Sequence, residues 1–119
     1  MLLSDDEPDY GHALTLYFEA EGYDVRHTTE AAETLEWARS WKPHAIITDV
    51  AKPKMDGLEM ARRLKADDQT EGIPVIVASA SCGSEEGRRR ALDAGAHSVL
   101  AKPLDPKELL RLLRDALGE

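Results

Sequence analysis

The chain has 119 residues, of which 42% are hydrophobic and 32% are charged, so we expect one globular domain spanning residues 1–119. Its formal net charge of −8 argues against direct nucleic-acid binding through the overall field, because the phosphate backbone would be repelled. A single cysteine excludes an intramolecular disulfide, and neither a secretory signal nor a membrane helix is predicted, so we expect a cytoplasmic protein without membrane contact.

The first half of the chain alternates short apolar runs with helical periodicities. A strand is expected at residues 1–4, where the acidic stretch DDEPD ends the apolar run, and a helix is expected at residues 10–21. Alternating side chains favour a half-exposed strand at residues 23–28. A helix follows at residues 29–41, with Thr29 as its expected N-cap. One side of this helix carries Leu35, Ala38 and Trp41.

The second half continues the alternation. Continuous apolar runs at residues 45–50 and 73–80 are typical of strands that are covered on both faces. The last helix has the clearest start, because Asp105 can cap it and Pro106 suits its first turn. In chain order, strands and helices are expected at residues 45–50, 57–68, 73–80, 84–96, 98–101 and 105–117.

Five strand–helix units in succession predict an α/β fold with a five-stranded parallel, doubly wound sheet. Five units are too few for an eightfold barrel. Sheets of this kind bind ligands beyond the carboxyl ends of their strands, so those ends are where a functional site is expected.

Acidic, hydroxyl and basic side chains stand at four of those strand ends. Three carboxylates at one rim repel one another, and a hard divalent cation such as Mg²⁺ would relieve that repulsion. A carboxylate oxygen could then attack an electrophilic phosphorus, while cationic and hydroxyl groups neutralise the phosphoryl oxygens. An Asp pair after a strand is by itself most often a solvated turn, but four coinciding strand ends are a much stronger signal. The residues are Asp5, Asp6, Asp49, Ser79 and Lys102.

Five motifs give the sequence a specific family resemblance over essentially its whole length. It resembles the receiver domain of two-component response regulators, including the chemotaxis regulators. The resemblance implies a flavodoxin-like fold with strand order 2-1-3-4-5. The motifs are DDEPD at residues 5–9, DVAKPKMDG at 49–57, VIVASA at 75–80, ALDAGA at 91–96 and AKPLDPKEL at 101–109.

The resemblance implies that Asp49 is the phosphoacceptor for a histidine kinase or a histidine phosphotransfer protein. It also implies that Mg²⁺ is the cofactor, bound directly by Asp6 and Asp49. Asp5 would act mainly through water, and the backbone carbonyl of Ala51 would complete the protein ligands. Such a domain promotes its own phosphotransfer and dephosphorylation, so it is not expected to be an enzyme for an outside substrate.

The resemblance also assigns a switching role to two further residues. Lys102 would pair with the phosphoryl group, and Ser79 would move to hydrogen-bond it. The peptide bond between Lys102 and Pro103 is expected to be cis. The family signals to a downstream protein through the elements expected at residues 84–96, 98–101 and 105–117, as a monomer or as a phosphorylation-dependent dimer.

Three positions depart from the family pattern. Val99 stands where an aromatic residue often reports the switch, which puts aromatic coupling in doubt. Lys52 stands where a hydrophobic residue is common; a solvated loop lysine is the simpler interpretation, and competition with Mg²⁺ is the other. The first strand begins only at Met1 and carries Ser4 where an aliphatic residue is common, and we expect either a clipped start or a slightly weakened strand.

Two rival functions remain open from the residues. The first is a phosphate-independent binding module that keeps the receiver fold; retention of all five strand-end residues speaks against it. The second is a Mg²⁺-dependent phosphohydrolase with an Asp nucleophile, which ranks last because no cap domain or further substrate pocket is predicted.

Overall fold

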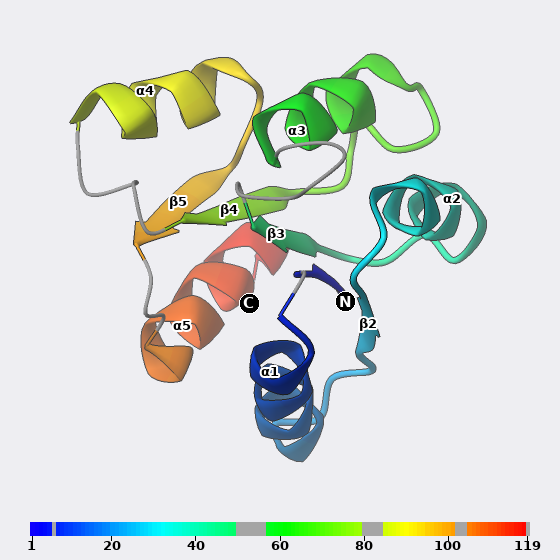
Figure 1. Cartoon of the computed structure of the whole chain (residues 1–119), viewed down its shortest axis with the longest axis vertical. Coiled ribbons are helices and arrows are strands. Elements are labelled where there is room, and N and C mark those ends of the chain that lie inside the picture. Colours follow the sequence, from blue (N-terminus) through cyan, green and yellow to red (C-terminus); the bar gives the residue numbers. More distant parts are fainter. Residues whose placement is uncertain (6, 50–56, 80–84, 102–104, 119) are drawn as a thin grey trace.

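The computed structural model describes residues 1–5, 7–49, 57–79, 85–101 and 105–118, and it shows five parallel strands with five helices (Figure 1). The strand order is β2-β1-β3-β4-β5, which confirms the predicted fold class and topology. The elements are β1 (Leu2–Ser4), α1 (Pro8–Ala20), β2 (Arg26–Thr28), α2 (Ala31–Ser40), β3 (Ile46–Asp49), α3 (Gly57–Ala66), β4 (Val75–Ser79), α4 (Glu85–Asp93), β5 (Ser98–Ala101) and α5 (Pro106–Leu117).

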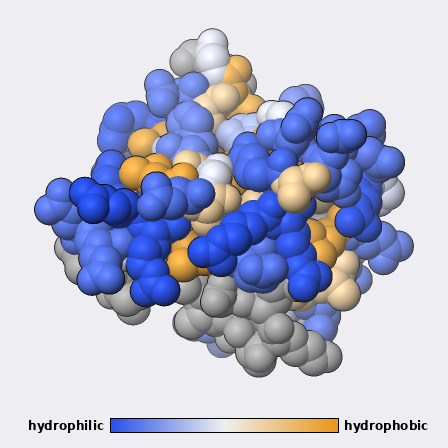
Figure 2. All heavy atoms as spheres, turned by 90° about the horizontal axis from the view of Figure 1, so that it is seen from above, coloured by the Kyte–Doolittle hydropathy of each residue, from blue (hydrophilic) through white to orange (hydrophobic). Residues whose placement is uncertain are grey.

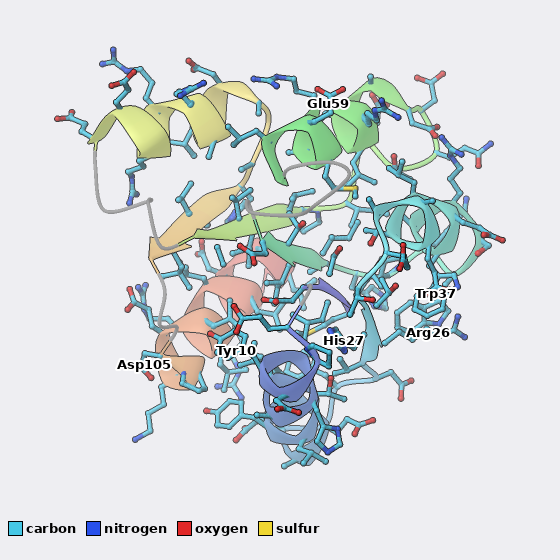
Figure 3. The ribbon with its side chains drawn as sticks, in the orientation of Figure 1. Tyr10, Arg26, His27, Trp37, Glu59 and Asp105 are labelled. Atoms are coloured by element: carbon cyan, nitrogen blue, oxygen red, sulfur yellow. The ribbon has the colours of Figure 1, made fainter. Side chains whose placement is uncertain are left out.

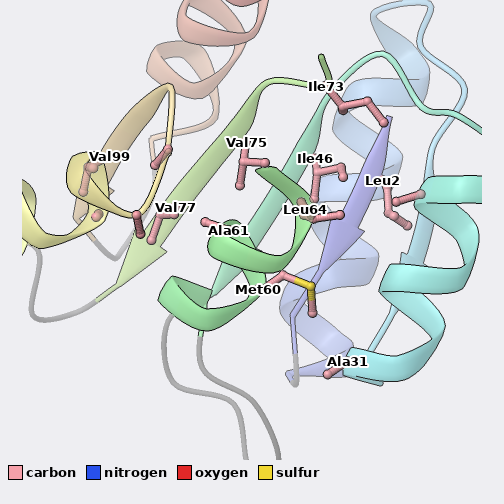
Figure 4. Close-up of a cluster of buried hydrophobic side chains, with 14 residues drawn as sticks. Leu2, Ala31, Ile46, Met60, Ala61, Leu64, Ile73, Val75, Val77 and Val99 are labelled. Atoms are coloured by element: carbon pink, nitrogen blue, oxygen red, sulfur yellow. The ribbon is translucent and has the colours of Figure 1, made fainter. Parts of the chain in front are cut away.

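The sheet separates two hydrophobic cores. Helices α2, α3 and α4 cover one face, where Figure 4 shows the buried cluster, and α1 and α5 cover the other (Figure 1). Successive strand residues point to opposite faces. Ile46 therefore joins the first core and Ile47 the second, and the same alternation runs through Val75, Ile76 and Val77. Both faces need apolar side chains, which is why these strands are continuous apolar runs rather than alternating ones.

The surface fits the polar composition of the chain. Figure 2 shows hydrophilic side chains over most of the face seen from above, with hydrophobic atoms exposed only in scattered groups. In the part of the chain that the structure describes, no helix combines the length and the apolar character that crossing a membrane requires.

The predicted start of the second helix was wrong. Helix α2 begins at Ala31 with Glu30 as its N-cap, and Thr29 does not cap it. The amide of Glu30 instead donates to the side-chain oxygen of Thr28, at 3.0 Å. Thr28 is buried at the end of β2, so the sheet holds its hydroxyl in place at the helix start, ahead of the expected cap.

The inner face of α2 is the predicted side, because Ala38 lies in the core and Leu35 and Trp41 pack against it. Its buried residues are Ala31, Thr34 and Ala38, whereas Leu35 and Trp41 are only half-buried. Small side chains let the helix approach β1 closely. The ring of Trp41 stays at the rim, where a guanidinium group lies 4.5 Å from its centroid, a favourable cation–π contact. That group belongs to Arg26, which also lies over Trp37 (Figure 3).

Ser4, the polar departure in the first strand, has a partner in this structure. It is fully buried, and its Oγ lies 2.7 Å from Oγ1 of Thr34 in α2. Thr34 donates its single hydroxyl hydrogen to the carbonyl of Glu30, at 2.9 Å, so Ser4 is the donor within the pair. The hydroxyl thus ties β1 to α2 instead of being left unsatisfied.

The predicted start of the last helix is confirmed. Asp105 caps α5, with its carboxylate accepting the amide of Lys107 at 3.0 Å, and Pro106 is the first helical residue. Gly95 follows α4 with φ of 104°, the left-handed conformation that favours glycine after a helix.

Candidate functional site

The register of the central strands brings two predicted acidic residues together. Ser4 at the end of β1 pairs with Thr48 of β3, so the next residues, Asp5 and Asp49, lie beside each other at the carboxyl edge of the sheet. Both are buried, with 3% and 5% of their surfaces exposed. Burying a carboxylate without a partner is energetically costly, so two buried carboxylates side by side indicate a site that binds a positively charged group.

A third carboxylate completes an acidic cluster with these two. The closest ligand oxygens of Asp5, Glu7 and Asp49 all lie within 4.8 Å of one another. Glu7 is exposed, unlike the other two. The sequence interpretation missed it, because it was treated only as part of the DDEPD stretch. The available signal was its position two residues after Asp5, at the turn that leads into α1.

That turn is fixed by local hydrogen bonds. The amide of Glu7 donates to Oδ1 of Asp5, at 2.9 Å, and the carbonyl of Glu7 accepts the amide of Gly11, at 3.0 Å. Pro8 occupies the first turn of α1, where a missing backbone N–H has no cost. The side chain of Asp5 thereby helps to shape the loop that carries Glu7 back toward Asp49.

The donor set suits a hard divalent cation. All three side chains offer carboxylate oxygens, the ligand type that Mg²⁺ and Ca²⁺ prefer, and the mutual repulsion of three negative charges would be relieved by one cation. Two of the three carboxylates are buried, so bulk water screens their attraction for a cation less than it would at the surface. The cluster therefore fits the cofactor that the sequence predicts.

The other predicted site residues are less fully described. Ser79 is the last residue of β4 and pairs with Ala101 of β5, which puts its backbone at the same sheet edge, but its side chain lies outside the described part. The remaining predicted features of the site also lie outside the described residues. These are Asp6, Ala51, Lys52, Lys102 and the Lys102–Pro103 peptide bond.

Val99 is a core residue in this structure. It lies in β5 with 7% of its surface exposed, and it belongs to the core beneath α3 and α4. A small β-branched side chain fits that enclosed position well. The departure from an aromatic residue is thus accommodated by packing.

A family model for the response regulator receiver domain matches residues 1–114. The chain is also 37% identical to an uncharacterized 14.6 kDa protein of Leptolyngbya boryana, over 96% of this chain and 86% of the relative. It is 32% identical to a DNA-binding transcriptional regulator of Synechocystis sp., over 98% of this chain. That regulator is longer, and the chain spans 48% of it.

Solved structures show the same fold at lower sequence identity. The receiver domain of a Francisella response regulator superposes with a TM-score of 0.91 at 26% identity, covering 98% of this chain and 94% of that one. The receiver domain of a sensor histidine kinase from Pseudomonas aeruginosa gives a TM-score of 0.88 at 27% identity, covering 99% and 96%. The latter structure has a magnesium ion coordinated in its active-site cleft.

Proposed function

Since the chain belongs to the response regulator receiver domain family of two-component systems, we propose that it is a phosphorylation-activated switch with Asp49 as its phosphoacceptor. The phosphoryl donor is a histidine kinase or a histidine phosphotransfer protein. The observation that carries the proposal is the buried carboxylate of Asp49 at the end of β3, with the carboxylates of Asp5 and Glu7 beside it.

The chemistry is a transfer between two side chains. A carboxylate oxygen of Asp49 forms a bond to phosphorus while the phosphorus–nitrogen bond of the donor phosphohistidine breaks, and the donor imidazole leaves with the bonding electron pair and takes up a proton. The strand fixes the direction of the Asp49 carboxylate, and its burial reduces the solvent reorganisation that accompanies attack.

The cation site belongs to the same proposal. Bound Mg²⁺ would offset the charge of the carboxylates and of the incoming phosphoryl oxygens. Asp6, Asp49 and the carbonyl of Ala51 would hold it, with Asp5 acting through water. Support comes from the oxygen-only cluster here and from the magnesium ion of the related Pseudomonas receiver domain.

The switch acts on the domain itself rather than on an outside substrate. Lys102 would pair with the phosphoryl group and Ser79 would hydrogen-bond it. The resulting shift would reach a downstream protein through the face of α4, β5 and α5. Arg88, Arg89 and Arg90 are exposed on α4, in keeping with a solvated helix face there.

The test is covalent labelling. The protein is incubated with Mg²⁺ and acetyl phosphate and then measured by intact mass spectrometry, with Asp49→Asn as the matched variant. We expect the wild type to gain the mass of one phosphoryl group only when Mg²⁺ is present, and Asp49→Asn to gain none. An unlabelled wild type, or equal labelling of the variant, contradicts the proposal.

A further inference from the structure

A histidine side chain contacts the backbone of the acidic cluster. His27 lies in β2, on the side toward α1 (Figure 3), and its Nε2 is 3.0 Å from the carbonyl oxygen of Asp5. A carbonyl oxygen can only accept, so Nε2 carries the hydrogen and donates it. His27 belongs to the half-exposed strand that is predicted at residues 23–28, and the sequence assigns no role to its side chain.

This contact takes the place of a backbone hydrogen bond in the ladder between β1 and β2. The amide of Asp5 continues the β1–β2 ladder by donating to the carbonyl of Thr28, at 3.1 Å. In a parallel ladder the carbonyl of Asp5 would next accept the amide of Glu30. That amide donates to the Thr28 side chain instead, at 3.0 Å. The imidazole of His27 supplies the donor that the ladder lacks, and it comes from the same strand.

The fold makes room for the imidazole at one point of α1. Gly11 is buried within this helix, and a Cβ added there would lie within 3.0 Å of three atoms of the His27 ring. Glycine is unfavourable inside a helix compared with alanine. Here the absent side chain is what allows the ring to reach Asp5.

The backbone of Asp5 is thus held from β2 on both sides, by its amide and by its carbonyl. Its side chain lies in the acidic cluster and accepts the amide of Glu7. Movement of the Asp5 backbone would shift its carboxylate and loosen the turn that carries Glu7. The geometry of two of the three clustered carboxylates therefore depends on the anchored peptide.

We propose that His27 is a positioning residue of the cation site: its imidazole, seated on Gly11, fixes the Asp5 carbonyl so that the carboxylates of Asp5 and Glu7 are preorganised for Mg²⁺. This inference rests on the proposed function, because it requires that the cluster bind the cation. When a residue that hydrogen-bonds to a metal ligand without touching the metal is lost, metal affinity typically falls by about 10- to 100-fold.

The experiment compares three variants with the wild type by Mg²⁺ titration, followed through the Glu7 amide resonance. His27→Phe keeps a ring over Gly11 but has no N–H, so we expect the Mg²⁺ midpoint to rise about tenfold. His27→Gln retains an amide donor of similar reach and should recover most of the affinity. Gly11→Ala displaces the imidazole and should resemble His27→Phe, although alanine favours a helix.

A matched control separates positioning from general destabilisation. Thr70 is buried, and its hydroxyl donates to the carbonyl of Leu64, at 2.6 Å, in a loop that does not contribute to the cluster. Thr70→Val removes a side-chain hydrogen bond of the same kind. It should lower the urea midpoint of unfolding and leave the Mg²⁺ midpoint unchanged. In the metal-free protein, His27→Phe should accelerate hydrogen exchange at the Glu7 amide, whereas Thr70→Val should not.

The outcomes distinguish the two proposals. A wild type that neither binds Mg²⁺ nor is labelled by acetyl phosphate contradicts the proposed function. A wild type that does both, beside a His27→Phe variant with an unchanged Mg²⁺ midpoint, contradicts the role of His27 alone. The role of His27 is also contradicted if the Mg²⁺ midpoint of His27→Phe shifts no further than that of Thr70→Val. If His27→Phe does not fold, the comparison of His27→Gln with Gly11→Ala decides, because only Gly11→Ala should weaken Mg²⁺ binding.

Discussion

At the scale of single residues, the acidic cluster combines carboxylates in two different environments. Asp5 and Asp49 are buried by the sheet edge, whereas Glu7 is exposed. Buried carboxylates have fixed directions and suit ligation or attack, while an exposed carboxylate contributes mainly charge, which salt screens. Glu7 is therefore expected to attract the cation, and the buried carboxylates are expected to position it, Asp49 directly and Asp5 through water.

Glu7→Gln tests this assignment. Removing one negative charge near the cation should raise the Mg²⁺ midpoint by about 2- to 5-fold at low salt, since an exposed charge interaction is worth about 0–1 kcal/mol. The maximum extent of labelling at saturating Mg²⁺ should stay unchanged. Isothermal titration at two salt concentrations measures both the shift and its screening.

The control for that variant is Glu36→Gln, which removes the same charge from an exposed position on α2. It should leave the midpoint close to that of the wild type. An equal shift in both variants would assign the effect to net charge and not to the cluster. A loss of labelling at saturating Mg²⁺ in Glu7→Gln would show that Glu7 is needed for the chemistry itself.

At the scale of elements, sheet pairing places the strand ends, and local contacts place the starts of α1, α2 and α5. Helix α1 begins at a turn shaped by Asp5, and α2 begins beyond the hydroxyl of Thr28. Helix α5 has a side-chain cap of its own, from Asp105. Its apolar stripe, formed by Leu109, Leu110 and Leu113, is buried against the sheet. The cap and the stripe together account for the clarity of this helix in the sequence.

Asp105→Ala measures the contribution of that cap. The variant leaves the amide of Lys107 without its side-chain acceptor and removes a negative charge from the helix N-terminus. We expect the free energy of unfolding to fall by about 1 kcal/mol. Asp115→Ala, near the other end of the same helix, is the matched variant and should not destabilise, because an anion near the C-terminus is unfavourable. Urea unfolding of both variants gives the comparison, and equal losses would contradict the capping role.

At the scale of the whole molecule, polar side chains link helices to the loops that connect other elements. Arg39 of α2 lies 2.6 Å from the carboxylate of Asp67, in the connection between α3 and β4. The amide of Gln69 also donates to that carboxylate, at 2.9 Å. The Gln69 amide, and then Arg39, hold the pKa of Asp67 below its ordinary value of 3.8.

This depressed pKa predicts a pH dependence of stability. The ionised form of Asp67 is favoured in the folded state, so its stabilising effect is present above pH 3.8 and is lost as the pH falls through the lower folded-state pKa. Asp67→Asn should therefore reduce the slope of stability against pH in the acid range. Asp68→Asn, one residue away, is the control. Urea midpoints measured across that range test this expectation, and parallel slopes for the wild type and Asp67→Asn would refute it.

The sequence predicted the site in outline because the relevant positions are strand ends. Continuous apolar runs located β3 and β4, and the alternation of strands and helices implied that all carboxyl ends share one edge. Asp5 and Asp49 could thus be expected to meet, and the structure places them side by side. The roles of Asp6, Ser79 and Lys102 stay predictions, since they came from the family resemblance and lie outside what the structure describes at side-chain level.

Long-range contacts are what the sequence alone did not determine. The inclusion of Glu7 in the cluster depends on how the turn before α1 folds back. How deeply each residue on the inner face of α2 is buried depends on how closely that helix packs against β1. The contacts of Ser4 with Thr34 and of His27 with Asp5 join positions 30 and 22 residues apart. Local periodicity determined which segments form strands and helices, because it reflects burial along one element. The tertiary structure decided which polar groups bond to one another or cluster together, because that depends on distances between elements.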